Sequence, residues 1–243
     1  MGYTEFAKYY DLYWTKDAPA LFEKVLNRIV LPSLPENAEI LDICCGTGQL
    51  CERLSRRFYR LTGIDNSQRM LDFAAQNAPN AVFSLQNAEN FSLPQEFSAV
   101  VSFFDSVNHF LSEEAVLNLF NSVRKALAPD GVFCFDINGI TAFDDGWDEG
   151  FSMVDSKSAC IVKPLFDPVS GSIVYNITIF EGCGGSYKRI DTAVKERYYS
   201  DDKILLLLRN SGFNEVQILD GCEDLMIKSF RGRHFFLARA NSV

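Results

Sequence analysis

The chain has 243 residues, 47% of them hydrophobic, and a formal net charge of −9 from 23 basic and 32 acidic side chains. This length accommodates one large α/β domain with a substantial core, and the hydrophobic content excludes a disordered chain. Nucleic acid is an unfavourable partner, because proteins that grip phosphate backbones carry basic patches, and the RGRH segment at 231–234 is expected to be a solvated turn.

Two further features bear on where the protein works. No apolar run approaches the roughly 20 residues needed to cross a bilayer, and the N-terminus lacks the pattern of a signal peptide. The seven cysteines are an odd number and are expected to be reduced thiols. We therefore expect a soluble, cytoplasmic protein with no membrane partner.

Short apolar runs alternate with helical patterns through the first half of the chain. Runs rich in Ile, Val, Leu and Phe predict strands buried on both faces, at 39–43, 60–64, 81–85, 99–104 and 131–137. The clearest helical pattern covers 113–127, with Ser112 as N-cap and an APDG turn at 128–131 that ends it. Strand–helix–strand repetition predicts a parallel sheet with helices on both faces.

The alternation of strand and helix patterns ends after residue 138. Residues 152–199 are extended segments separated by turns, a pattern that predicts an antiparallel β meander inserted into the α/β plan. A helix at 201–211, capped by Ser200, and strands at 213–219 and 233–240 complete the chain. The first 30 or so residues are helical in pattern and rich in aromatic residues, so we expect them to lie over the sheet as a lid.

The segment ILDICCGTGQL at 40–50 leaves the first strand and enters a helix. Its glycines allow a tight turn that approaches a ligand, and Asp65 at the tip of the next strand can accept hydrogen bonds from both hydroxyls of a ribose. A dinucleotide fingerprint needs a third Gly or Ala, but Cys51 stands there. Asp42 would repel a pyrophosphate and suits a ligand that carries an ammonium group.

Five motifs in order resemble those of the class I S-adenosylmethionine-dependent methyltransferases. The first is matched by LDICCGTG at 41–48, the second by GIDNSQRML at 63–71 and the third by QNAENFSLP at 86–94. The fourth is matched by VVSFFDSVNHF at 100–110, and the strand-five motif by LAPDGVFCFDI at 127–137. The resemblance implies a Rossmann-like, doubly wound, seven-stranded sheet, mostly parallel with an antiparallel last strand, plus the inserted meander.

The same resemblance implies S-adenosylmethionine as the cofactor and indicates which residues bind it. Cys44 stands where Gly or Ala is usual, and Asn87 where Asp is common. Tyr9 or Tyr13 is expected to cover the cofactor carboxylate, with simple helix packing as an equal alternative. The other expected cofactor-binding residues are Asp42, Cys44, Gly46, Thr47, Gly48, Asp65, Asn66, Met70, Asn87, Ala88, Phe103 and Phe104.

The fourth motif bears on the methyl acceptor. Family members that methylate amino groups of bases or of glutamine carry an Asn/Asp-Pro-Pro-Tyr turn there, whereas this chain has FDSV at 104–107. With the acidic charge, this favours a small-molecule acceptor with an amine nitrogen, which needs alignment and little else. A hydroxyl acceptor needs a base. His109 is the candidate catalytic residue, with a capping or packing role as its alternative.

Other polar residues near the expected cleft have two interpretations. Asp105 and Asn108 either orient an acceptor or cap the turn before the next helix. Glu196 ends the meander near the cleft, although a solvated face is the default for a charged side chain, and His234 is expected to be structural. Two distant histidines and the absence of a Cys-x-x-Cys pair argue against a metal.

The domain plan and the competing functions follow from these motifs. We expect the cofactor-binding domain to comprise residues 1–138 and 197–243, with the meander at 139–196 covering the acceptor site or contacting a second subunit of a homodimer. Amine methylation is the favoured function, and methylation of a hydroxyl group is the first alternative. A nucleotide-dependent oxidoreductase and a non-catalytic cofactor-binding protein are alternatives from other classes.

Overall fold

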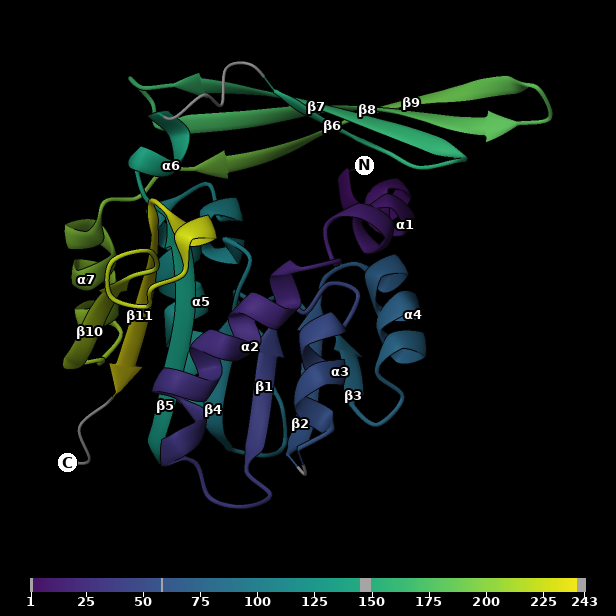
Figure 1. Ribbon diagram of the computed structural model, residues 1–243. Helices are drawn as coiled ribbons and strands as arrows, with labels where there is room; N and C mark the ends of the chain where they lie inside the picture. The colour runs from purple at the N-terminus through teal and green to yellow at the C-terminus, as the bar shows by residue number, and fades with distance from the viewer. Residues whose placement is uncertain (1, 58, 145–149, 240–243) are drawn as a thin grey trace.

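The computed structural model describes residues 2–57, 59–144 and 150–239, and its larger sheet contains seven strands. The order is β10-β11-β5-β4-β1-β2-β3, in which β11 runs antiparallel to both neighbours and the other pairs are parallel. This confirms the predicted Rossmann-like sheet (Figure 1). Its strands are β1 (Glu39–Ile43), β2 (Arg60–Asp65), β3 (Val82–Leu85), β4 (Phe97–Ser102), β5 (Leu127–Asn138), β10 (Glu215–Asp220) and β11 (Arg233–Arg239).

The strand order reverses between β1 and β4. From β1 the chain moves outward to β2 and β3, and it then returns to build β4 and β5 on the other side. The loops that follow β1 and β4 therefore diverge at the carboxyl ends of adjacent strands. A crevice at such a switch point is the usual ligand site of open α/β sheets.

Helices cover both faces of this sheet (Figure 1). The cluster on one face includes α2 (Ala18–Ile29) and α3 (Gln49–Ser55), and the cluster on the other includes α5 (Glu113–Ala126) and α7 (Asp201–Asn210). At the β3 edge, α4 (Gln68–Asn77) packs beside α1 (Gly2–Tyr13). The short helices are η1 (Leu31–Ser33), η2 (Ser106–His109), α6 (Thr141–Asp144) and η4 (Lys228–Phe230). None of the described helices is both long and apolar enough to span a bilayer.

The strands alternate their side chains between the two helical layers. Leu41 and Ile43 of β1 belong to the cluster with α5, whereas Ile40 belongs to the cluster with α2, because successive strand residues point to opposite faces. Phe133 and Phe135 of β5 are fully buried under α5. Burying one such ring contributes about 1.5–3 kcal/mol, so this central strand is firmly fixed.

The predicted helix caps are confirmed, and one predicted turn is revised. The Ser112 hydroxyl accepts a hydrogen bond from the amide of Ala115 (3.1 Å), and the Ser200 hydroxyl accepts one from Lys203 (3.3 Å). The APDG segment does end the helix, but β5 already begins at Leu127 and contains the segment as an irregularity in its pairing with β4. Residue 240, the end of the last predicted strand, lies outside the described residues.

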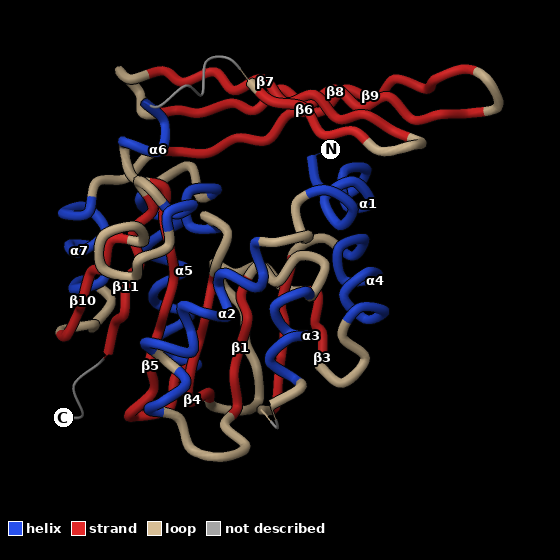
Figure 2. Tube along the Cα trace, viewed as in Figure 1, coloured by secondary structure: helices blue, strands red, loops and turns tan. Residues whose placement is uncertain are grey.

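A second sheet lies across the carboxyl ends of the parallel strands, as Figures 1 and 2 show. It is antiparallel in the order β6-β7-β8-β9, and it confirms the predicted inserted meander. Phe6 and Tyr9 of α1 pack against its inner face, so the N-terminal helix lies between the two sheets. The strands are β6 (Phe151–Val154), β7 (Ser158–Asp167), β8 (Ser172–Cys183) and β9 (Ser186–Arg197).

Candidate active site

A cavity of about 750 Å³ lies between the carboxyl edge of the large sheet and the inner face of the small one. Its walls come from α1, from the loops after β1 to β4, and from β7, β8 and β9. The predicted residues that line it are Cys44, Gly46, Asp65, Asn66, Met70, Asn87, Ala88, Phe104 and His109. The fold thus brings together side chains from four loops that are distant in the sequence.

Asp65 fixes one end of the cavity. It ends β2, where one carboxylate oxygen accepts a hydrogen bond from the amide of Gly46 (3.0 Å) and the other accepts one from the amide of Ser67 (2.9 Å). Burial raises the pKa of Asp65, and these backbone hydrogen bonds oppose that rise. The carboxylate therefore joins the first two loops and also faces the cavity, where it can accept hydrogen bonds from ligand hydroxyls.

The two glycines of the first loop have different roles. Gly46 lines the cavity, and a Cβ there would lie 3.4 Å from the Tyr10 ring. Gly48 has a φ of +76°, and a Cβ there would lie 2.9 Å from the Cα of Ala74 in α4. Gly48 does not line the cavity, so the structure gives it a packing role between α3 and α4 instead of a contact with a ligand.

Cys44 faces the cavity with a left-handed backbone, at a φ of +57°. Burial raises the pKa of the Cys44 thiol, so it stays protonated and behaves as a small apolar side chain. Its neighbour Cys45 packs beside the cluster of α2 and α3, and burial raises its pKa as well. These two thiols are suited to packing and not to redox chemistry.

We expect Cys44→Leu to weaken S-adenosylhomocysteine binding about tenfold, which corresponds to about 1.4 kcal/mol. The added carbons would project into the space beside the first loop, where the side chain already faces the cavity. Isothermal titration calorimetry measures the effect, and Cys44→Ala, which only removes volume, should stay within about twofold of the wild type. Equal affinities of the Leu variant and the wild type would contradict this role.

A smaller cavity of about 20 Å³ adjoins the first loop and is lined by Asp42, Thr47 and Phe103. Burial raises the pKa of Asp42 to about 7, and a hydrogen bond from the Cys51 thiol (3.4 Å) opposes this. The Thr47 hydroxyl is buried and has no hydrogen-bond partner among the described residues. A buried orphan hydroxyl beside a carboxylate fits a ligand that brings its own polar groups, such as the amino-acid end of S-adenosylmethionine.

The N-terminal helix offers Tyr10 to the cavity, whereas Tyr9 and Tyr13 do not line it. The Tyr13 hydroxyl hydrogen-bonds to Ser158 (2.7 Å to its Oγ), and Tyr9 is buried against the small sheet. Helix residues three or four apart share a face, so 9 and 13 turn together toward the sheet. Tyr10 and Trp14, whose rings stack at 6.3 Å, face the cavity instead.

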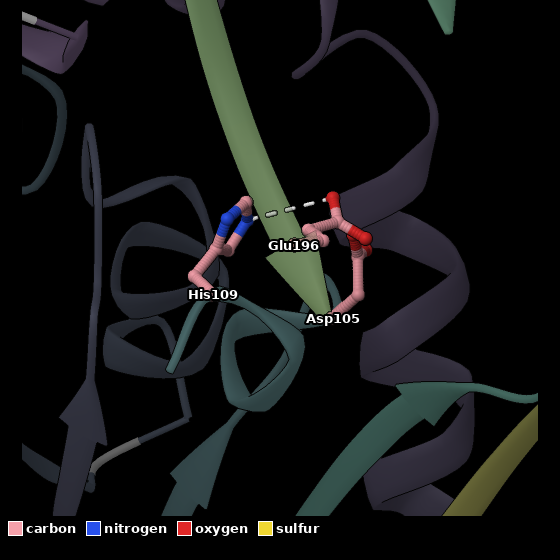
Figure 3. Close-up of side chains that lie close together, drawn as sticks. All are labelled: Asp105, His109 and Glu196. Atoms are coloured by element: carbon pink, nitrogen blue, oxygen red, sulfur yellow. Dashed lines mark ion pairs between the residues drawn. The ribbon is translucent and has the colours of Figure 1, made fainter. Parts of the chain in front are cut away.

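At the other end of the cavity, His109 meets two carboxyl groups (Figure 3). Asp105 and His109 lie in the segment after β4, Glu196 comes from β9, and one ligand atom from each lies within 4.8 Å of the others. The Nδ1 of His109 lies 3.1 Å from the carbonyl oxygen of Lys195 and must donate to it. In the neutral ring Nε2 is then the basic nitrogen, and it lies 3.8 Å from the Glu196 carboxyl.

The backbone that carries Asp105 is strained. Phe104 and Asp105 follow β4 with φ values of +63° and +51°, a conformation that costs about 1–2 kcal/mol for each such residue. The amide of Asp105 donates a hydrogen bond to the carboxylate of Asp136 (3.1 Å), which fixes this backbone. The side chain of the nearby Asn108 donates to the carbonyl of Arg197 (3.0 Å) and accepts from the amide of Asn138 (2.9 Å). Asn108 therefore ties the end of β9 to β5, which is a structural role.

Arg233 completes this end of the cavity. Its guanidinium donates to Asp105 (3.0 Å) and to Asp136, a buried carboxylate of β5. It also lies over the rings of Phe22 (5.6 Å) and Phe230 (5.7 Å). The expectation that the RGRH segment is a solvated turn is therefore wrong for Arg233, because β11 runs back beside β5 and brings this side chain to Asp136.

Burial and neighbouring charges change the protonation of the carboxyl groups at this end of the cavity. Glu196 is 3% exposed, and burial, with the adjacent charge of Asp105, raises its pKa well above the usual value. Burial alone would raise the pKa of Asp105 too, but Arg233, His109 and a hydrogen bond with Glu196 lower it overall. Glu196 is thus a buried acid and not the exposed residue that its charge suggested, because β9 ends against the loop after β4.

The set of Asp105, His109 and Glu196 also contains the donor types that a metal ion uses. This set differs from the histidine and cysteine clusters considered in the sequence, because it combines His109 with the nearby Asp105 and with Glu196, which is distant along the chain. In the structure, however, Asp105 already pairs with Arg233, and Glu196 is arranged to keep its proton. Both features favour an organic cation over a metal as the ligand of this cluster.

Comparison with known proteins places this arrangement among methyltransferases. Residues 40–131 match the family model described as a methyltransferase domain. The chain is 29% identical to the putative methyltransferase YqeM of Bacillus subtilis (strain 168), over 87% of each chain. It is 32% identical to dTDP-3-amino-3,4,6-trideoxy-alpha-D-glucopyranose N,N-dimethyltransferase of Streptomyces venezuelae, over 58% of this chain and 61% of that protein.

The fold is also similar to that of solved methyltransferase structures. An S-adenosylmethionine-dependent methyltransferase from Clostridium acetobutylicum ATCC 824 superposes with a TM-score of 0.81 at 24% identity, over 98% of this chain and 99% of that one. At this identity, the match shows the shared fold alone.

Proposed function

We propose that this chain, which matches a methyltransferase-domain family model over residues 40–131, is a class I S-adenosylmethionine-dependent methyltransferase and that it methylates the amine nitrogen of a small molecule held in the cavity beneath the small sheet. The main support for this proposal is the set of charged side chains at the end of the cavity opposite Asp65. Asp105 and Glu196 bring two carboxyl groups there, next to the single guanidinium of Arg233 and the imidazole of His109. A wall of this kind favours a cationic amine over a neutral hydroxyl.

We assign the cofactor to the end of the cavity formed by the first three loops. Asp65 would accept from the ribose hydroxyls, and Asn87 with Ala88 would meet the adenine. Asp42 and Thr47 would hold the ammonium and carboxylate of the methionine end, where their small cavity adjoins Cys44. When bound, S-adenosylmethionine supplies a methyl group on a positively charged sulfur.

The protein contributes alignment and exclusion of water. The small sheet, α1 and the loop after β4 surround the space between the two ends of the cavity. Phe6, Tyr10 and Trp14 add apolar walls. Placing two reactants in one desolvated orientation lowers a barrier by up to about 7–11 kcal/mol, so a neutral amine needs no further activation. A hydroxyl acceptor would require His109 as its base.

One relative supports an amine acceptor. The Streptomyces venezuelae protein is named for N,N-dimethylation of an amino sugar, and its sequence matches 58% of this chain. The amine is therefore the favoured acceptor group, and methylation of a hydroxyl is the second candidate because His109 lines the same cavity. The homodimer expected from the sequence stays a prediction.

An acceptor panel tests the proposal. Purified protein is incubated with methyl-labelled S-adenosylmethionine and with matched amino and hydroxy compounds, such as amino sugars and their parent sugars, and transfer is followed by mass spectrometry. We expect methylated amines and no methylated parent sugars. Transfer to hydroxyl groups alone would replace the amine assignment, and binding of S-adenosylhomocysteine without any transfer across the panel would favour a non-catalytic protein.

A further inference from the structure

We propose that Asp105 and Glu196 act as one proton-sharing carboxyl pair that binds the acceptor as an ammonium ion, and that Arg233 is the positioning residue that keeps Asp105 ionised. This inference rests on the proposed amine methylation. It assigns a cation-binding site to residues that come from β9, from the loop after β4 and from the start of β11.

The position of Glu196 first supports a shared proton. Its side chain is 4% exposed, so an ionised carboxylate there would lose nearly all its hydration. The Tyr175 hydroxyl lies 3.3 Å from one oxygen of Glu196, and a carboxylate oxygen of Asp105 lies within 4.8 Å of the Glu196 carboxyl group. Two carboxyl groups this close are not both ionised at neutral pH, because like charges at short range raise one of the two proton affinities.

Arg233 then decides which carboxyl keeps the proton. It donates to Asp105 and Asp136 together, and neither of these bonds reaches Glu196. The rings of Phe22 and Phe230 lie against the guanidinium and fix its place. Asp105 therefore stays ionised, and Glu196 holds the proton and can donate it to Asp105.

The charged and titratable groups around the Asp105–Glu196 pair favour the binding of a cation. From the segment after β4 come Asp105 and His109, from β9 comes Glu196, from β8 comes Tyr175, from β5 comes Asp136 and from β11 comes Arg233. One guanidinium serves two aspartates, so a negative charge remains at the wall of the cavity. An ammonium group is the small-molecule cation that hydrogen-bonds to such a wall with several N–H donors.

The proposed step balances in atoms and charge. The ammonium N–H bond breaks and its proton moves to the basic Nε2 of His109, so the carboxyl pair keeps its one proton and its negative charge. The freed nitrogen lone pair forms the new bond to the methyl carbon as the carbon–sulfur bond breaks, with its electrons going to sulfur. His109, whose Nε2 lies 3.8 Å from Glu196 and whose side chain is 24% exposed, then passes this proton to solvent.

Carbon-13 NMR of carboxyl-labelled protein, saturated with S-adenosylhomocysteine, tests the pair directly. We expect Glu196, assigned with Glu196→Gln, to stay protonated through pH 7 in the wild type. In Asp105→Asn its midpoint should fall by about one pH unit or more, because the neighbouring charge is gone. Asp191→Asn removes an exposed charge from the same strand and should leave the midpoint unchanged. An ionised Glu196 at pH 7 in the wild type would overturn the shared proton.

The role of Arg233 needs a variant that stays folded. Arg233→Gln is therefore combined with Asp136→Asn, which removes the buried charge that the guanidinium neutralises, and Asp136→Asn alone is the matched control. We expect Asp105 to titrate at least one pH unit higher in the double variant than in the control. Equal Asp105 midpoints in the two proteins would show that Arg233 has only a structural role.

Methylammonium chloride is the probe for the cation site, with methanol as its neutral control. Saturating methylammonium should lower the Glu196 midpoint by about half a pH unit or more in the wild type, and methanol should not. No shift with methylammonium would overturn the ammonium site, and selective broadening of the three residues by Mn²⁺ would assign a metal there instead. The acceptor panel reports separately on the proposed function, because these titrations require no turnover.

Discussion

Arg233→Met is expected to lower the free energy of unfolding by about 3–5 kcal/mol, the cost of removing one partner from a buried ion pair. The Met side chain keeps much of the contact with Phe22 and Phe230 but leaves Asp105 and Asp136 without their shared guanidinium. Asp136 is fully buried, and one of its oxygens already lacks a hydrogen-bond partner among the described residues. The loss of charge neutralisation should therefore dominate.

The same substitution has a defined pH dependence. Burial raises the pKa of Asp136 to about 6 even with Arg233 present, so removing Arg233 should raise it further. A carboxyl whose pKa is higher in the folded state than in the unfolded state takes up protons on folding as the pH falls. The defect should thus be largest above the raised pKa of Asp136 and should shrink as the pH falls toward the unfolded value near 4.

Urea unfolding followed by circular dichroism at pH 5 and pH 8 measures both effects. Asp136→Asn introduced into the Arg233→Met protein should recover part of the lost stability, because it removes the buried charge. Arg56→Met is the matched surface control. Arg56 forms an exposed ion pair with Glu52, and the variant should stay within about 1 kcal/mol of the wild type. Equal effects of the two Arg→Met changes would contradict a buried role for Arg233.

The large sheet was predictable because its signals are local. Buried parallel strands such as β4 and β5 contain runs of consecutive apolar residues, and glycine and serine mark the turns and caps between the elements. The glycine loop and Asp65 belong to the same local pattern, since a strand end places its last side chain at the carboxyl edge of the sheet. The position of such residues in the fold is therefore determined by their near neighbours in the sequence.

The acceptor end of the cavity could not be predicted in this way. Arg233 and Asp105 are 128 residues apart, and His109 is 86 residues from the Lys195 carbonyl that sets its tautomer. Nothing in RGRH or in the end of the meander distinguishes a buried charge from a solvated one. Only the return of β11 beside β5, and the docking of β9 through Asn108, bring these groups together.

The N-terminal helix shows a finer limit. Its aromatic content predicted contact with the cavity, but Tyr9, Tyr10 and Tyr13 could be separated only by the face of the helix that meets the small sheet. Buried and exposed side chains alternate in β7, where Cys160 and Val162 are buried, so the small sheet has an apolar inner face. This alternation could have identified the sheet as the packing partner of the helix. The small sheet therefore decides which face of the helix is buried against it, and Tyr10 lies on the face that meets the cavities.

Asp65→Ala is expected to weaken S-adenosylhomocysteine binding about 100-fold, or about 2.7 kcal/mol. The carboxylate has two tasks, since it accepts from the amides of Gly46 and Ser67 and faces the cavity where a ribose would lie. Its removal takes away the acceptor for the ribose hydroxyls and leaves two loop amides without their partner. Calorimetry with wild type and variant gives the total loss.

A ligand without one ribose hydroxyl separates the two tasks of Asp65. Wild-type protein should bind 2′-deoxy-S-adenosylhomocysteine about tenfold more weakly than the parent compound, because one hydrogen bond to a charged acceptor is lost. Asp65→Ala should bind the two ligands about equally, since the acceptor is already gone. If the variant still prefers the parent compound tenfold, the 2′-hydroxyl binds elsewhere and Asp65 serves only to hold the loop through Gly46 and Ser67.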